Sequence, residues 1–205
     1  MDPALFIRGL ILGFTIAAAV GPISLLVIRR TLAEGRVVGL VSGMGVATAD
    51  GTYGAIAAFG LTVITDLLMD WRRALGIVGG IFLLWLAWRT LWSAPREAAT
   101  ESATRRRGLP GAYLSTLVLT LTNPLTILSF AALFVGLGVT GGDLSGATLL
   151  TLGVFAGSAL WWVVLTTLVG ALRSRLTTTG LRRVNIASGL LIGAFAIVAI
   201  ATAIL

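Results

Sequence analysis

The chain has 205 residues, of which 57% are hydrophobic and 11% charged, and its mean hydropathy is +1.01. Because a soluble domain has about 25% charged residues, this composition is typical of an integral membrane protein. The sequence contains no His and no Cys, which excludes the common zinc and haem ligands, thiol nucleophiles and a catalytic triad built on His. We therefore expect neither an enzyme nor a cofactor or metal site.

Six apolar segments are each long enough to cross a bilayer, which takes about 20 helical residues. In chain order they cover residues 6–28, 38–64, 74–92, 113–137, 146–172 and 184–204. The sequence thus predicts an all-α integral membrane protein with six transmembrane helices. The hydrophilic segment 93–112 separates a first three-helix repeat, residues 1–92, from a second, residues 113–205, and is expected to be a cytoplasmic linker.

The arginines are distributed unequally between the two sides of the predicted membrane. Twelve lie at or beside the segments that follow the first, third and fifth spans, whereas Arg8, Arg72 and Arg73 lie on the other side. Positive charge marks the cytoplasmic side, so we expect a multi-pass membrane protein with both termini facing outward and the three odd-numbered loops in the cytoplasm. This placement explains the net charge of +7 without nucleic acid, and basic residues beside a membrane can also contact lipid.

The two halves resemble each other at a shift of 110 residues. Under this shift Gly43, Gly60, Arg72-Arg73 and Gly79 fall on Gly153, Gly170, Arg182-Arg183 and Gly189. Three spans per half is an odd number, which gives the two copies opposite orientations in the membrane. Inverted repeats of this kind occur in many secondary transporters, whose substrate site lies between the halves near the membrane midplane.

A proline-containing pair interrupts the first span of each half, namely Gly21-Pro22 in span 1 and Asn123-Pro124 in span 4. Proline removes a helical hydrogen bond, and Gly or Asn before it suits the start of a new helix. We expect broken helices 1 and 4, whose new N-termini offer N–H groups and a positive dipole to a substrate carboxylate. Plain proline kinks are the alternative.

Asp50 is the only ionisable residue deep inside a predicted span. Burial of a charged side chain in a membrane costs about 2.5–3.5 kcal/mol on insertion scales, so a functional role is the default interpretation. Asp50 could bind an ammonium or guanidinium group, or it could carry a proton. The alternative is a protonated side chain that is hydrogen-bonded by Thr48, Thr52 or Tyr53.

Other candidate residues each have a functional and a structural interpretation. Hydroxyl side chains flank the breaks at Ser24, Thr120, Thr122 and Ser129. They could bind substrate or satisfy the interrupted backbone. Trp161-Trp162 could offer an aromatic face to a cation or pack in the core. Glycines four positions apart, such as Gly9 and Gly13, favour close helix packing.

The motifs also resemble those of a known family. Gly21-Pro22 is followed by Arg29-Arg30, Gly35-Arg36, Gly39-Leu40, Gly43-Met44-Gly45, Ala49-Asp50 and Ala58-Phe59-Gly60-Leu61, and Asn123-Pro124 stands in the second half. This combination resembles the lysine exporter (LysE/RhtB) family of bacterial amino-acid exporters. The resemblance implies amino-acid efflux across the bacterial inner membrane, driven by protons or the membrane potential, and the outward termini are then periplasmic. Leu125 stands where many members have Lys, so the substrate of any one member does not transfer to this chain.

We therefore predict a secondary-active exporter of amino acids, either basic or small neutral ones, that needs no cofactor. The predicted substrate-binding residues are Gly21, Pro22, Ser24, Asp50, Thr122, Asn123 and Pro124, with Asp50 also the candidate for proton coupling. The alternatives are a divalent-metal or other small-ion exporter of the wider superfamily, and a membrane scaffold that transports nothing. A homodimer is compatible with the prediction.

Overall fold

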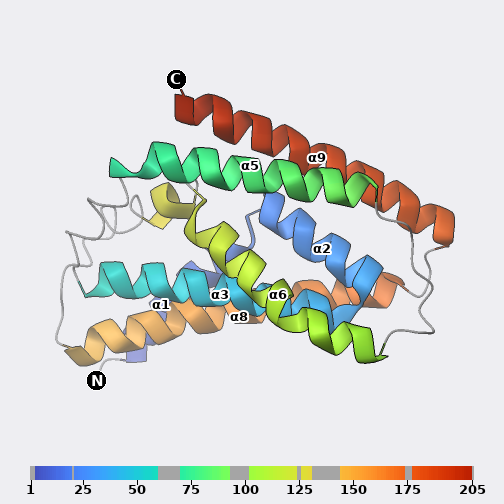
Figure 1. Cartoon of the computed structure of the whole chain (residues 1–205). Helices are drawn as coiled ribbons and strands as arrows, with labels where there is room; N and C mark the ends of the chain where they lie inside the picture. The colour runs from blue at the N-terminus through green and yellow to red at the C-terminus, as the bar shows by residue number, and fades with distance from the viewer. Residues whose placement is uncertain are drawn as a thin grey trace.

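The computed structural model describes residues 3–19, 21–59, 70–92, 102–123, 126–130, 144–173 and 177–204 (Figure 1). Its long helices are α1 (Pro3–Ala17), α2 (Pro22–Glu34), α3 (Arg36–Ala58), α5 (Arg72–Leu91), α6 (Ser102–Leu121), α8 (Leu144–Arg173) and α9 (Thr178–Ile204). A short helix covers residues 126–130. All regular structure in the described ranges is helical, which confirms the predicted all-α class.

Several helices are long and apolar enough to cross a membrane. Arg73–Leu91, Leu144–Leu172 and Thr179–Ile204 each qualify alone, and α1 and α2 qualify together as one broken span with a bend of 79°. The structure thus supports a membrane protein but not the full predicted set of six spans. Among the described residues, α3 falls short because it mixes Asp50 with many Gly, Ala and Thr residues. In α6 only Gly108–Leu121 is apolar.

Two helices extend beyond the predicted spans. α2 continues past residue 28 to Glu34, where Gly35 ends it with a φ of 103°. This left-handed backbone favours glycine, and the Gly35 N–H donates to the carbonyl oxygens of Arg30 and Thr31. α6 begins at Ser102, so residues 102–112, which were expected to be linker, form its first turns.

The helices run alternately between two ends of the molecule. α1 begins and α9 ends at one end, whereas α2, α5 and α8 end, and α3 and α6 begin, at the other (Figure 1). Arg30, Arg36, Arg89 and Arg182 belong to the helix ends at this second end, which we call the arginine end. The alternation agrees with the predicted separation of charge, while the side of the membrane that each end faces stays a prediction.

α1 and α8 pack backbone against backbone through glycine. The glycines in this contact are Gly9 and Gly13 on α1 and Gly153 and Gly157 on α8. A Cβ at Gly13 would collide with the carbonyl oxygen of Val154, and a Cβ at Gly157 would collide with that of Leu10. These small residues therefore serve close helix packing, as the sequence predicts.

α2 lies at the centre of the helix packing. It contacts α3, α6, α8 and α9, while α5 packs against α9. Leu26 and Val27 of α2 are fully buried and join a core cluster with Trp162 of α8 and Ile192 of α9. Because Pro22, at the start of α2, is also buried, the N-terminus of this helix lies inside the protein.

Candidate functional site

The first helix break lies between α1 and α2. Gly21 has an extended backbone, and its carbonyl oxygen accepts the first hydrogen bond of α2 from the N–H of Leu25 at 3.1 Å. No side chain caps this N-terminus, so the N–H groups of Ile23 and Ser24 have no partner within the helix. The new helix start that the sequence predicts at Gly21-Pro22 is therefore present, with two backbone donors inside the protein.

The second break follows the same pattern in the other half. α6 ends at Leu121, and the Asn123 carbonyl accepts a hydrogen bond of 3.1 Å from the N–H of Ile127 in the helix at 126–130. The Tyr53 hydroxyl donates to the Leu121 carbonyl at 2.6 Å, which satisfies an oxygen near the interruption. Pro124 lies outside the described residues.

A cavity of about 80 Å³ joins the two breaks. This volume holds several water molecules, since one water needs about 10–15 Å³ on this measure. Among the predicted binding residues, Gly21, Pro22, Ser24, Asp50 and Asn123 line it. Its walls come from α1, α2 and α3 of the first half and from α6, the 126–130 helix and α8 of the second. The structure thus brings together residues from both halves of the sequence.

Thr122 is the predicted residue that falls outside this cavity in the described part of the chain. It lines a smaller space of about 10 Å³, which Pro22 and Asn123 also border. Its hydroxyl donates to the Val118 carbonyl at 2.9 Å, and the Thr120 hydroxyl donates to that of Thr116 at 2.8 Å. These bonds agree with the interpretation that the hydroxyls hydrogen-bond to the helix backbone near the break.

The hydroxyl of Ser24 has a similar role at the first break. It donates to the Ala19 carbonyl at 3.1 Å, across the interruption between α1 and α2. Since a hydroxyl has two acceptor lone pairs besides its one donor, Ser24 can still accept a hydrogen bond from a ligand in the cavity. Ser129 and Thr126 line the same cavity from the 126–130 helix.

Asp50 is 2% exposed, and its carboxylate accepts a hydrogen bond of 2.6 Å from the Ser158 hydroxyl of α8. The alternative interpretation, in which Asp50 is hydrogen-bonded by Thr48, Thr52 or Tyr53, is wrong. The hydroxyls of Thr48, Thr52 and Tyr53 donate to backbone carbonyls instead. One carboxylate oxygen is thus held by the opposite half of the chain, and Asp50 lines the cavity.

Trp162 lines the cavity, although the sequence analysis left the Trp161-Trp162 pair open between a cation site and core packing and did not place it among the substrate-binding residues. Its side chain is 1% exposed, packs on Gly43 and lines the cavity. In the described part of the chain its indole N–H has no hydrogen-bond partner. A buried donor without a partner costs about 1–3 kcal/mol. The Trp161-Trp162 pair was the available signal, but its N–H groups could not be placed from sequence.

Comparison with known proteins identifies the family. Residues 14–202 match the LysE type translocator family, and the chain belongs to it. A stretch of 112 residues is 31% identical to an uncharacterised membrane protein of Escherichia coli (strain K12), YahN, and covers 53% of this chain. That match spans about half of YahN, 49% of its length. No solved structure matches the chain.

Proposed function

We propose that this LysE type translocator is a secondary-active exporter of amino acids across the bacterial inner membrane, with the cavity around Asp50 as its substrate site. One observation carries the proposal. The N-terminus of α2, the Asn123 break and the Asp50 carboxylate, which come from both halves of the chain, border a single cavity. Such a site between repeats at interrupted helices is typical of secondary transporters.

The two ends of an amino acid fit the two kinds of group in this cavity. The N–H groups of Ile23 and Ser24 at the start of α2 are donors for a carboxylate. Asp50 is an acceptor for the ammonium group, and the Ser24 hydroxyl can accept a further bond from it. The site is therefore complementary to a zwitterion.

Asp50 also supplies a simple route to coupling. A carboxylate that holds an ammonium group cannot hold a proton at the same oxygen, so substrate and proton compete for Asp50. Protonation from the periplasm would release the amino acid there, and loss of that proton to the cytoplasm would restore the site. This competition gives exchange of amino acid for protons, which is export.

The helix packing supports an inverted-repeat carrier. In an inverted repeat the α1–α2 pair corresponds to α6, α3 corresponds to α8, and α5 corresponds to α9. The contact of α1 with α8 then corresponds to the contact of α6 with α3. Exchange of the two halves would leave the pairs α3–α8 and α5–α9 as they are. α6 and the α1–α2 pair also run in opposite directions (Figure 1). The two breaks would then be equivalent positions, one opening toward each side in turn.

A metal-ion exporter is the competing function. In the described residues no group of three or more His, Cys, Asp and Glu side chains could hold a metal ion. Among the described residues that line the cavity, Asp50 is the one carboxylate, whereas a small divalent cation usually requires several oxygen, nitrogen or sulfur ligands.

The test is counterflow in proteoliposomes that contain the purified protein. We expect accumulation of a radiolabelled amino acid when the vesicles are preloaded with the same amino acid, and no accumulation of ⁴⁵Ca²⁺ or ¹⁰⁹Cd²⁺. Empty liposomes and vesicles with the Asp50→Asn variant are the controls. Cation uptake without amino-acid counterflow would replace the proposed function by the metal alternative.

A further inference from the structure

A second and much larger cavity lies at the arginine end. Its volume is about 940 Å³, at the upper end of the range of about 300–1,000 Å³ that is usual for ligand pockets. It is bordered by the last turns of α2 and α5, by residues 108–115 of α6 and by Asn185 of α9. We call it the vestibule. α2 connects the two cavities, because its first turn lines the Asp50 cavity and its last turns line the vestibule.

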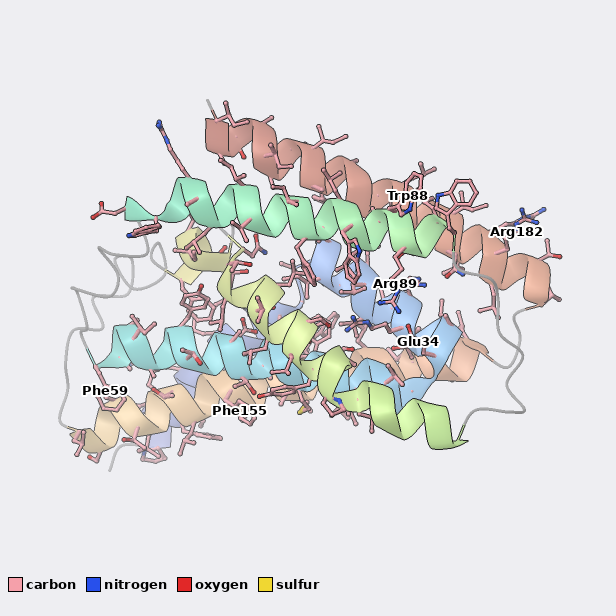
Figure 2. The ribbon with its side chains drawn as sticks, viewed as in Figure 1. Glu34, Phe59, Trp88, Arg89, Phe155 and Arg182 are labelled. Carbon is pink, nitrogen blue, oxygen red and sulfur yellow. The ribbon has the colours of Figure 1, made fainter. Side chains whose placement is uncertain are left out.

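The charged groups of the vestibule are mainly positive. Arg29, Arg30 and Arg89 line it together with one acid, Glu34. Figure 2 shows Arg89 and Glu34 between α5 and α6 near the end of α2, while Arg182 lies apart on α9. The lining therefore carries an excess of positive charge in the part of the chain that the structure describes.

Arg30 is buried, and its guanidinium group donates three hydrogen bonds. It is 9% exposed, and its Nη1 donates to the Ser42 hydroxyl at 2.9 Å and to the Ala112 carbonyl at 3.0 Å. Its Nη2 donates to the Ser115 hydroxyl at 2.8 Å. These partners are neutral, and they use three of the five guanidinium N–H groups. Within the described residues these bonds leave two N–H donors, and the acid that acts on the Arg30 charge is Glu34, which is exposed.

A buried charge is costly unless an opposite charge accompanies it. Arg29 is equally buried, at 9% exposure, and its Nε donates to the neutral Asn185 side chain at 3.3 Å. Glu34 is the described acid in the lining, but its side chain is exposed. An anion in the cavity would add to the charge balance of this lining, and guanidinium groups favour carboxylates.

We propose that the vestibule is an anion site that receives the carboxylate of the amino acid before it reaches Asp50, so that the exporter selects neutral and acidic amino acids over basic ones. This inference rests on the proposed function and narrows its substrate class. A neutral amino acid can contact Arg30 through its carboxylate, and an acidic amino acid has a second carboxylate that can contact the arginines. A basic amino acid carries a net positive charge and is repelled by the excess of arginine.

Three tryptophans make the vestibule directly observable. Trp85, Trp88 and Trp92 line it, so their fluorescence reports the local concentration of a charged quencher. In nanodiscs of neutral lipid we expect iodide to quench the fluorescence more than caesium does, because the arginines concentrate anions. Glutamate should protect against iodide, glutamine should protect less, and lysine should not protect.

Variants that each remove one charged side chain test whether the charge of the vestibule controls iodide quenching. Arg89→Gln should lower the iodide quenching constant and Glu34→Gln should raise it, each by about two- to fivefold, as expected for one charge in a solvated site. Arg182→Gln removes an arginine at the same end but outside the vestibule, and should change nothing. Equal quenching in all four proteins, or stronger quenching by caesium, would overturn the anion site.

Anionic lipid is the other source of a negative group. If phosphatidylglycerol in the nanodiscs suppresses iodide quenching while glutamate gives no protection in neutral lipid, the vestibule holds a lipid headgroup and the substrate assignment is wrong. Protection by glutamate in neutral lipid supports the assignment to substrate.

Counterflow of glutamate, glutamine and lysine in neutral-lipid vesicles completes the test. Glutamate and glutamine should exchange faster than lysine, and Arg30→Gln should lower both rates by about tenfold or more, the value of a charge-assisted hydrogen bond. Preference for lysine would overturn the inference and leave the exporter function intact. Absence of all counterflow, with glutamate protection preserved, would overturn the exporter function and leave the anion site standing.

Discussion

Ser158 on α8 donates a hydrogen bond of 2.6 Å to the carboxylate of Asp50 on α3, so the buried acid of the first half is held by the second. The two residues are 108 positions apart in the chain. If transport requires the halves to move against each other, this bond is one of the contacts that must form and break in each cycle.

Replacement of Ser158 should affect transport more than folding. Ser158→Ala removes the partner of Asp50 and should cost about 1–3 kcal/mol of stability if the acid remains charged. Because Asp50 would lose its orientation, counterflow should slow markedly. Ser158→Thr keeps a hydroxyl and should retain most of the rate. Thr167→Val, a change on the exposed side of α8, serves as the control. Normal counterflow in Ser158→Ala would mean that this bond is dispensable.

Asn123→Ala separates substrate contact from helix capping. Loss of an N-cap side chain costs about 0.5–2 kcal/mol, which the thermal melting of the purified protein will report. Since Asn123 lines the Asp50 cavity, we expect substrate binding to weaken more than this loss of stability implies. Asn123→Ser keeps a capping group and removes the amide. If the Ser variant transports normally, the side chain caps the helix and does not contact the substrate.

The local features of the site were predictable because they depend on neighbouring residues. Pro22 has no N–H and Gly21 suits an N-cap, so these two adjacent residues are enough to predict the helix break. The partner of Asp50 depends on which face α8 turns toward α3. Three hydroxyls within three residues of Asp50 offered partners from its own helix, whereas Ser158 is brought near only by the packing of the two halves.

The vestibule could not be predicted for a related reason. The sequence places Arg29 and Arg30 just beyond span 1 on the cytoplasmic side, but α2 continues to Glu34 and buries both. Gly35 sets that length through its left-handed backbone. Their partners Asn185 and Ser115 come from α9 and α6, and no spacing along the sequence relates them to Arg29-Arg30.

The glycine contact between α1 and α8 can be tested with one type of substitution at two sites. Gly157→Ala places a Cβ against the carbonyl oxygen of Leu10, so we expect the helices to separate and stability to fall by about 1–3 kcal/mol. Gly111→Ala places the same Cβ where no atom lies within 4 Å, and should be neutral or slightly stabilising. Thermal melting in one detergent compares them. Equal melting temperatures would show that the α1–α8 contact tolerates a methyl group.

The orientation in the membrane is testable without purified protein. The arginine distribution predicts that a reporter fused after Leu205 is periplasmic and that one inserted between residues 96 and 107 is cytoplasmic. Alkaline phosphatase, which is active outside the cytoplasm, and a fluorescent protein, which is active inside, give opposite signals at each site. A cytoplasmic carboxyl-terminal reporter would contradict both the arginine argument and the inverted repeat.

Asp50→Asn distinguishes the two roles of the buried acid. The substitution keeps the size of the side chain and removes its charge and its titration. If Asp50 binds the ammonium group, affinity should fall by about 1.5–3 kcal/mol, the value of a hydrogen bond to a charged group. If Asp50 only carries the coupling proton, binding and exchange should persist while accumulation driven by a pH gradient is lost. We expect the first result together with loss of gradient-driven transport.

The fold should survive this substitution, because a charged side chain inside a membrane was unfavourable at the outset. Asp70→Asn makes the same chemical change at an exposed position and should leave binding, exchange and accumulation unchanged. Binding and gradient-driven flux are measured side by side on the two variants and the unmodified protein. Normal values for Asp50→Asn in both assays would show that neither substrate nor proton uses Asp50. The cavity would then need another acceptor for the ammonium group, and the hydroxyls of Ser24 and Ser158 are the ones to replace next.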